Sequence, residues 1–388
     1  MKHSSQLPTS LKLETVAICY SGALLPILFA VFLLNLWSLQ ETLTWLIQTE
    51  FIWLLVTYRV NKLLYLNRSS RQEEIYSKLG WANRLTLLRG FLIAITGGFI
   101  FQPNLNETVL LIPALSYFFA AIIDRVDGYI ARLTMHESLL GTALDIESDA
   151  LGLLIAPSLA IWIGQIHWSY LSVSLAYYLF QWGLYWRLKH NKPICQLPPN
   201  MSRRAIAGFQ MGFLAVVLWP VLAPPATMIA GLAFMLPLLV GFIMDWLTLS
   251  GRIKIDDPLT KSLLHQLNKA LHLVILPMLR VLIILLLCLI LIRINYFSLL
   301  TVGDGFYHIN STLLIGLLFS GVMILFGVNG RFFAIILSCL LCWCFITYDI
   351  QVLDGVLLVS VIWVMQFGTG KFSLWVWDDN WVNRYDGA

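Results

Sequence analysis

The chain has 388 residues, of which 59% are apolar and only 12% are charged, and its mean hydropathy is +0.79. Soluble domains carry about 25% charged residues, so the composition excludes a soluble enzyme, a secreted disulfide scaffold and a disordered chain. The net charge of +4 is too small and too scattered for a nucleic-acid-binding surface, so nucleic acid is not an expected partner. The composition instead predicts an all-α polytopic membrane protein.

Apolar runs recur along the whole chain, each about as long as the ~20 residues that cross a bilayer as a helix. The first run is too long for the core of a cleaved signal peptide, so we read it as a first span. About twelve spans are predicted in total. They cover residues 15–37, 43–60, 84–102, 107–131, 141–163, 167–186, 204–222, 225–248, 271–292, 311–328, 331–348 and 353–367.

Four blocks follow from the spacing of these spans. Residues 1–75 are predicted as an N-terminal two-span hairpin with a basic linker, and residues 76–250 as a six-span block. Residues 251–270 form the most polar long stretch and are predicted as a cytoplasmic linker. Residues 271–388 are predicted as a C-terminal four-span membrane domain with a polar tail.

Lysine and arginine determine the predicted orientation. They gather in connections 59–89, 125–132, 187–204 and 252–269, and the intervening connections contain few or none. Short loops rich in these residues stay on the cytoplasmic side of a membrane. A twelve-span topology places all of these connections on that side, so we expect an integral membrane protein with both termini in the cytoplasm.

Four aspartates gather where the fourth span ends and the fifth begins. Asp124 and Asp127 are three residues apart, and Asp145 and Asp149 are four apart, so each pair shares one helix face. Carboxylates crowded at a membrane edge repel one another, so a cation is expected between them. Oxygen ligands without His or Cys suit Mg²⁺, Mn²⁺ or Ca²⁺. Two such ions held by four carboxylates can clamp a phosphoryl group during in-line displacement.

The residues beside these acids favour a phosphate-bearing ligand. Gly128 and Ala131 lie on the same helix face as the first aspartate pair and leave room for close approach. Arg132 offers a planar fork for phosphate oxygens. The alternative is a set of solvated acids at helix ends, where Asp145 and Asp149 would suit the helix dipole.

The pattern D-x-x-D-G-x-x-A-R-x8-G-x3-D-x3-D over residues 124–149 resembles the signature of the CDP-alcohol phosphatidyltransferases. Upstream, the segment ANRLTLLR at 82–89 resembles the Asn-x-x-Thr-x-x-Arg motif of that family. The resemblance covers the six-span block. It implies a six-helix bundle that moves a phosphatidyl group from CDP-diacylglycerol to an alcohol and releases CMP, in phospholipid biosynthesis.

The resemblance also implies roles for individual residues. Two divalent cations, Mg²⁺ or Mn²⁺, would lie among the aspartates, with Asp124 and Asp145 bridging both ions. Asp127 would bind one ion and Asp149 the other, and Asp149 would also be the catalytic general base. The residues implied in binding the CDP-lipid are Asn83, Thr86, Gly128, Ala131, Arg132, Ser138 and Gly141.

The acceptor alcohol is left open by the sequence, since glycerol phosphate, inositol phosphate and an uncharged alcohol all fit. A basic cluster spans residues 187–204, and the segment NMSRRAIAGFQM at 200–211 loosely resembles the acceptor-phosphate segment of glycerophosphate-type relatives. Ala207 stands where those relatives have threonine. We expect Arg203 and Arg204 to bind the acceptor; the alternative is topological charge that attracts anionic lipid.

Two features lie outside the six-span block. The segment QFGTGKFSLWVWDD at 366–379 resembles the ending of DoxX-like four-span membrane proteins and assigns no activity. Arg280 lies inside a predicted span, where pairing with an acid is expected.

A transporter would need two similar halves with interrupted helices, and a catalytically silent assembly or anchoring protein would not need the intact aspartate pattern. The expected partners are the donor lipid, an alcohol acceptor and membrane lipids, with a homodimer left open.

Overall fold

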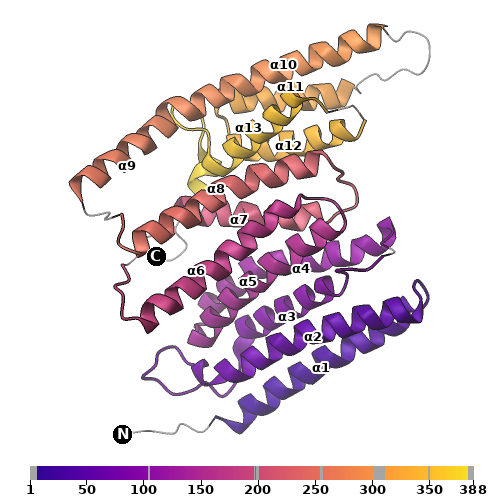
Figure 1. Cartoon of the computed structure of the whole chain (residues 1–388), viewed down its shortest axis with the longest axis vertical. Coiled ribbons are helices and arrows are strands. Elements are labelled where there is room, and N and C mark those ends of the chain that lie inside the picture. The colour runs from indigo at the N-terminus through magenta and orange to yellow at the C-terminus, as the bar shows by residue number, and fades with distance from the viewer. Residues whose placement is uncertain are drawn as a thin grey trace. The chain divides into compact units, whose positions relative to one another are not determined.

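The computed structural model describes residues 7–103, 105–195, 197, 201–253, 257–300, 311–347 and 350–382. Over these residues the chain consists of helices and connections, without a β-strand beyond one isolated bridge (Figure 1). The predicted all-α class is therefore confirmed. The chain forms two compact units: Met1–Gly164 with Met211–Pro220, and Gln165–Gln210 with Val221–Ala388.

The first unit begins with an antiparallel hairpin, as the sequence predicts. Its second helix is capped by Ser38, whose side chain and Glu41 exchange hydrogen bonds with each other's backbone amides. Its helices are α1 (Thr9–Leu33), α2 (Leu39–Leu63), η1 (Leu64–Leu66), α3 (Gly80–Gly97), α4 (Glu107–Leu133) and α5 (Leu139–Trp162). The central helix of this set is α3, which packs against α2, α4 and α5.

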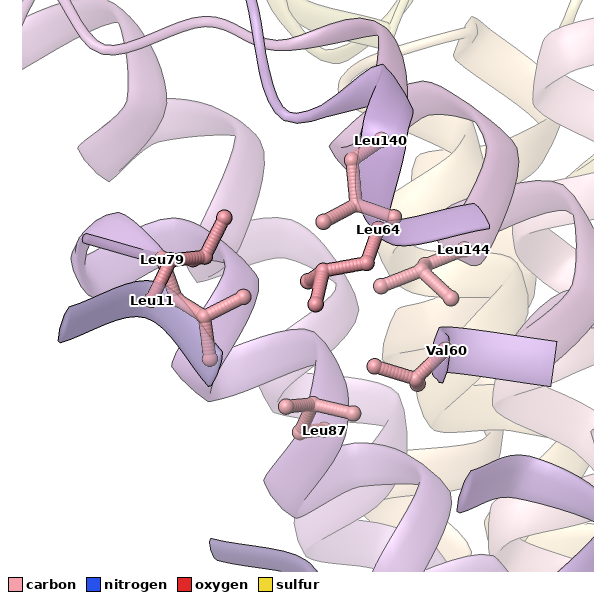
Figure 2. Close-up of a cluster of buried hydrophobic side chains, with 7 residues drawn as sticks. All are labelled: Leu11, Val60, Leu64, Leu79, Leu87, Leu140 and Leu144. Carbon is pink, nitrogen blue, oxygen red and sulfur yellow. The ribbon is translucent and has the colours of Figure 1, made fainter. Parts of the chain in front are cut away.

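One apolar cluster joins the hairpin to the helices that follow it. Seven buried aliphatic side chains from the hairpin, α3 and α5 meet there (Figure 2): Leu11, Val60, Leu64, Leu79, Leu87, Leu140 and Leu144. Each fully buried Leu or Val contributes about 1.5–3 kcal/mol. The hairpin therefore shares its core with α3 and α5.

The second unit contains the remaining helices. They are η2 (Trp168–Tyr170), α6 (Leu171–Lys189), α8 (Ala226–Leu249), α9 (Pro258–Ala270), η3 (Leu271–Ile275), α10 (Leu276–Leu300), α11 (Ser311–Phe326), α12 (Gly330–Thr347), α13 (Val352–Phe367) and α14 (Trp377–Val382). Helix α7 (Met201–Val217) contributes to both units. Within the second unit α13 packs against α8, α10 and α12.

Most of residues 251–270, which are predicted as a linker, is helical. Asp257 accepts a hydrogen bond from the Thr260 amide, and Pro258 occupies the first helical position of α9. Helix α9 then continues through η3 into α10 (Figure 1). Low hydropathy concealed this helix, since none of its residues is buried.

Arg280 in α10 corrects one prediction. In the described part of the chain its guanidinium donates to backbone carbonyls rather than to an acid. The acceptors are Ile324 O at 2.9 Å and Leu325 O at 3.0 Å, with Thr369 O at 3.2 Å from the other side. The first two carbonyls end α11 and carry the negative end of its dipole. Arg280 thus ties the segment after α13 to the end of α11.

Four described helices are long and apolar enough to cross a membrane: Thr9–Leu33, Glu107–Leu133, Ala226–Leu249 and Pro258–Arg293. The predicted total of about twelve spans is not supported by this criterion. Helix α5 shows the reason, since it carries Asp145, Glu147 and Asp149 in its first half. Helices α11 and α13 are apolar but only 16 residues long.

Candidate active site

Helices α4 and α5 bring three of the four predicted metal ligands together. Asp124 lies near the end of α4, and Asp145 and Asp149 lie in the first half of α5. One carboxylate oxygen from each of these three residues lies within 4.8 Å of the other two. The end of α4 and the first half of α5 therefore contribute carboxylates to one place.

Asp127 is placed differently. It is not a member of that group, and its Oδ2 accepts a hydrogen bond from Thr86 Oγ1 at 2.8 Å. Its side chain is buried, unlike those of Asp145 and Asp149, which are 48% and 50% exposed. The structure thus gives Asp127 a fixed orientation from α3, and leaves the two α5 carboxylates open to solvent.

Arg89 of α3 lies among the three converging carboxylates and is fully buried. Its Nη1 is 2.6 Å from Asp124 Oδ1 and 2.9 Å from Asp145 Oδ1. Its Nη2 is ion-paired with Asp149. The cation expected between the acids is therefore supplied in part by a side chain of the chain itself, a role that the sequence analysis did not assign.

The motif at the start of α3 acquires a physical meaning from these contacts. Asn83, Thr86 and Arg89 recur every three residues and share one helix face. Asn83 contacts Ser138 before α5, Thr86 contacts Asp127 on α4, and Arg89 contacts the acids of both helices. Each motif residue therefore fixes a different part of the aspartate-bearing segment relative to α3.

Asn83 and Ser138 already have internal partners. The Asn83 amide nitrogen donates to Ser138 Oγ at 3.0 Å and to Leu79 O at 2.7 Å. Ser138 Oγ also accepts from the Gly141 amide at 3.0 Å, which caps α5. A β-carbon at Gly141 would lie 2.6 Å from Asn83 Oδ1, so any other residue there would displace the buried Asn83 amide. The predicted contact of these residues with the donor lipid stays a prediction.

Gly128 shows the opposite environment. A β-carbon there would meet only Arg132 Nη1, at 3.7 Å, so the space beside this glycine is open. Arg132 is exposed and Ala131 is half-buried, so both can be reached from solvent. This side of α4 therefore has room for a ligand, as the sequence predicts for a phosphate-bearing one.

The charges at the site leave a negative excess. Four aspartates carry −4, and Arg89 supplies +1. The donor set consists of carboxylate oxygens, which hard divalent cations prefer. Asp145 and Asp149 are open enough for an ion to enter. The residues present therefore fit a divalent metal centre.

Residues 79–248 match the family model described as CDP-alcohol phosphatidyltransferase. The match covers 170 of the 388 residues, so it shows the similarity of this segment to that family. The phosphatidyltransferase segment begins directly before α3 and ends within α8, which confirms the resemblance drawn from the sequence. No curated protein and no solved structure matches the chain.

The matched family consists of transferases for substituted phosphate groups, which act on CDP-alcohols in lipid biosynthesis. The family is membrane-bound and in general uses divalent metals. The hairpin α1–α2 and the helices from α9 onward lie outside the matched residues.

The predicted acceptor residues lie in the second unit. Arg203 is ion-paired with Asp245 of α8 at 3.1 Å, and Arg204 is exposed on α7. Part of the surrounding basic cluster has a structural role, since Arg187 donates to Pro193 O and Ser250 O. The acceptor role of Arg203 and Arg204 stays a prediction.

Proposed function

We propose that this chain transfers the phosphatidyl group of CDP-diacylglycerol to an alcohol and releases CMP, with two divalent cations, Mg²⁺ or Mn²⁺, at the aspartates. The observation that carries the proposal is the convergence of Asp124, Asp145 and Asp149 with a net negative charge beside the open face at Gly128. The family match supplies the reaction class.

The four aspartates would hold the ions, with Asp124 and Asp145 shared and Asp127 and Asp149 binding one each. Bound divalent cations would neutralise the donor diphosphate and the charge that develops at the reacting phosphorus. Thr86 supports Asp127 in this arrangement, because their 2.8 Å hydrogen bond orients the carboxylate. Arg89 supports the others by holding three carboxylates in one cluster.

The donor lipid would bind along the exposed side of α4. Gly128 and Ala131 leave room for the diphosphate, and Arg132 donates to its oxygens. Asn83, Thr86, Ser138 and Gly141 contribute from behind this surface, since they are buried or already hydrogen-bonded.

Asp149 would be the general base. Its side chain is half-exposed, so an acceptor hydroxyl can reach it. The hydroxyl proton passes to the Asp149 carboxylate as the acceptor oxygen bonds to the phosphatidyl phosphorus. The bond from that phosphorus to the bridging diphosphate oxygen breaks, and CMP leaves with the bond's electron pair.

The acceptor phosphate, where the acceptor carries one, would pair with Arg203 and Arg204. Guanidinium groups bind phosphate through two parallel hydrogen bonds. We also propose that the site faces the cytoplasm, because the connections beside it are rich in arginine and lysine.

The test is CMP release by the full-length protein in nanodiscs, with CDP-diacylglycerol and a panel of alcohols. Release should require Mg²⁺ or Mn²⁺ and stop in EDTA. Asp124→Asn should abolish it, whereas the matched control Asp257→Asn, which removes an acid at the start of α9, should not. Undiminished release in EDTA would overturn the two-metal proposal.

A further inference from the structure

The N-terminal hairpin lies outside the family match, yet it reaches the helices of the active site. Its residues Leu11, Val60 and Leu64 share the apolar cluster with residues of α3 and α5 (Figure 2). Arg59 of α2 also pairs with Glu147, which lies between the two metal-binding aspartates of α5. The hairpin is thus fastened to α5 by apolar and by charged contacts.

The linker that joins this hairpin to α3 is held closed by one residue, Asn67. Its side chain is fully buried. Its backbone carbonyl accepts a hydrogen bond from the Tyr76 amide at 2.8 Å. Its side-chain nitrogen donates to the backbone carbonyl of Lys78 at 2.8 Å. These bonds use the amide nitrogen and backbone of Asn67 and leave its Oδ1 for another partner.

That partner is Asn83, the first residue of the α3 motif. The two N–H groups of Asn83 Nδ2 are shared among three acceptors: Leu79 O at 2.7 Å, Ser138 Oγ at 3.0 Å and Asn67 Oδ1 at 3.1 Å. The neighbouring linker residue contributes a second link, because the Arg68 carbonyl accepts from the Leu139 amide at 2.9 Å. The linker therefore contacts α3 and the start of α5 at the same place.

The consequence concerns the position of α5. Ser138 caps this helix, and Asp145 follows seven residues later, about 10 Å along the helix axis. With Asn67 Oδ1 as an acceptor, the Asn83 amide keeps its nitrogen toward Ser138 and Leu79 O. Without that acceptor, one of the three contacts that orient the Asn83 amide is lost, so the amide is held less firmly against the capping serine.

We propose that Asn67 is a positioning residue that acts through Asn83 and Ser138 to place the metal-binding aspartates of α5. The inference rests on the proposed function, because it assumes that these aspartates bind divalent cations. It extends the active site of this chain to a residue of the hairpin linker that the family match does not cover.

Two substitutions separate positioning from simple loop closure. Asn67→Leu removes the acceptor for Asn83 and the donor for Lys78 O. Asn67→Asp also removes the amide donor for Lys78 O, but it keeps an oxygen facing Asn83 and nearly the same shape, so the two variants differ in the acceptor for Asn83. The readout is Mn²⁺ affinity, measured by electron paramagnetic resonance of free Mn²⁺ with the full-length protein in nanodiscs, together with the unfolding temperature.

We expect Asn67→Leu to weaken Mn²⁺ binding about tenfold, the scale seen when partners that orient metal ligands are lost. Asn67→Asp should bind Mn²⁺ more tightly than Asn67→Leu, because it keeps the acceptor for Asn83. The matched control is Glu14→Gln, which weakens the hairpin's contacts with Arg84 and the Leu79 amide without touching Asn83. It should lower the unfolding temperature and leave Mn²⁺ affinity unchanged.

The inference is overturned if the Asn67→Leu protein has a lower unfolding temperature but binds Mn²⁺ as tightly as the unchanged protein. If Asn67→Leu does not fold, the same comparison is made with Asn67→Ala, in which water can enter the vacated space. An unchanged protein that binds no Mn²⁺ would overturn the proposed metal centre itself, and the inference with it.

Discussion

Replacing Arg89 with methionine removes a buried positive charge from among three carboxylates and keeps an apolar side chain of similar length. The expected result is a loss of stability that depends on divalent metal. In EDTA the carboxylates are left to repel one another. In Mn²⁺ the bound cation takes over part of the neutralisation that Arg89 supplied, so the deficit becomes smaller.

The size of the effect follows from the geometry. Two unit charges 4.8 Å apart repel by about 0.9 kcal/mol at the dielectric constant of water and by about 3.5 kcal/mol at an effective value of 20. Asp145 and Asp149 are half-exposed, which favours the lower figure for that pair. Arg89→Met ends the attraction of the guanidinium for three carboxylates and leaves this repulsion uncompensated. Removing one partner of a buried ion pair costs about 3–5 kcal/mol, and the half-exposure of Asp145 and Asp149 favours the lower end of that range, about 3 kcal/mol, in EDTA.

The assay is thermal unfolding of the full-length protein in nanodiscs, followed by tryptophan fluorescence with EDTA or Mn²⁺. Arg84→Met is the matched control, because Arg84 lies on the same helix and pairs with Glu14 at 2.7 Å. That partly exposed pair should contribute about 1 kcal/mol or less, equally in EDTA and Mn²⁺. An Arg89→Met protein as stable as the unchanged one in EDTA would refute the reasoning, as would a deficit that Mn²⁺ leaves unaltered.

Three further outcomes are expected. Asp149→Asn should keep more affinity for the CDP-lipid than Asp124→Asn while losing CMP release, because the main proposed role of Asp149 is to accept a proton. A rate of CMP release that is mostly retained in Asp149→Asn would contradict the general-base role. Gly128→Val should raise the donor KM with little loss of stability, whereas Gly141→Ala should lower the unfolding temperature, since only the second meets a neighbour within 3 Å; equal effects on both readouts would contradict the distinction. Arg204→Ala should raise the KM of a phosphorylated acceptor roughly ten- to a hundredfold, as loss of a charge-assisted hydrogen bond of ~1.5–3 kcal/mol implies; an unchanged KM would favour a topological role.

The helices of the phosphatidyltransferase segment could be predicted from hydropathy because burial in a membrane demands long apolar runs. The predicted span at 107–131 lies within α4, and the span at 225–248 runs from the N-cap of α8, Pro225, to one residue before its end. Helix α9 could not be found this way, since an exposed helix needs no apolar run. Its capping residue Asp257 and the following Pro258 were the signal that the sequence offered.

The site was predictable where spacing alone determines which residues share a face. Asp145 and Asp149 fall on one face of α5 for this reason, and Asp124 meets them across a short turn. Arg89 could not be placed by spacing, because its contacts depend on how α3 packs against α4 and α5. The sequence offered one signal, its position three residues after Thr86 on the same helix face.

The two motif glycines show how one residue type can serve opposite purposes. A β-carbon at Gly141 would displace the Asn83 amide, so the glycine permits the packing of α5 on α3. Gly128 has open space beside it, so its lack of a side chain serves access rather than packing. A signature read from sequence assigns both to the ligand, and only the tertiary contacts separate them.

The α3 motif explains why the aspartates need a third helix at all. Asp124 on α4 and Asp145 on α5 belong to adjacent helices that repulsion between carboxylates would push apart. Arg89 opposes that repulsion directly, while Thr86 holds the remaining aspartate and Asn83 holds the capping serine of α5. Because Asn67 binds Asn83 from the hairpin linker, the same chain of contacts begins outside the matched segment and ends at the carboxylates. Loss of any one of these contacts should therefore weaken metal binding while the individual helices stay folded.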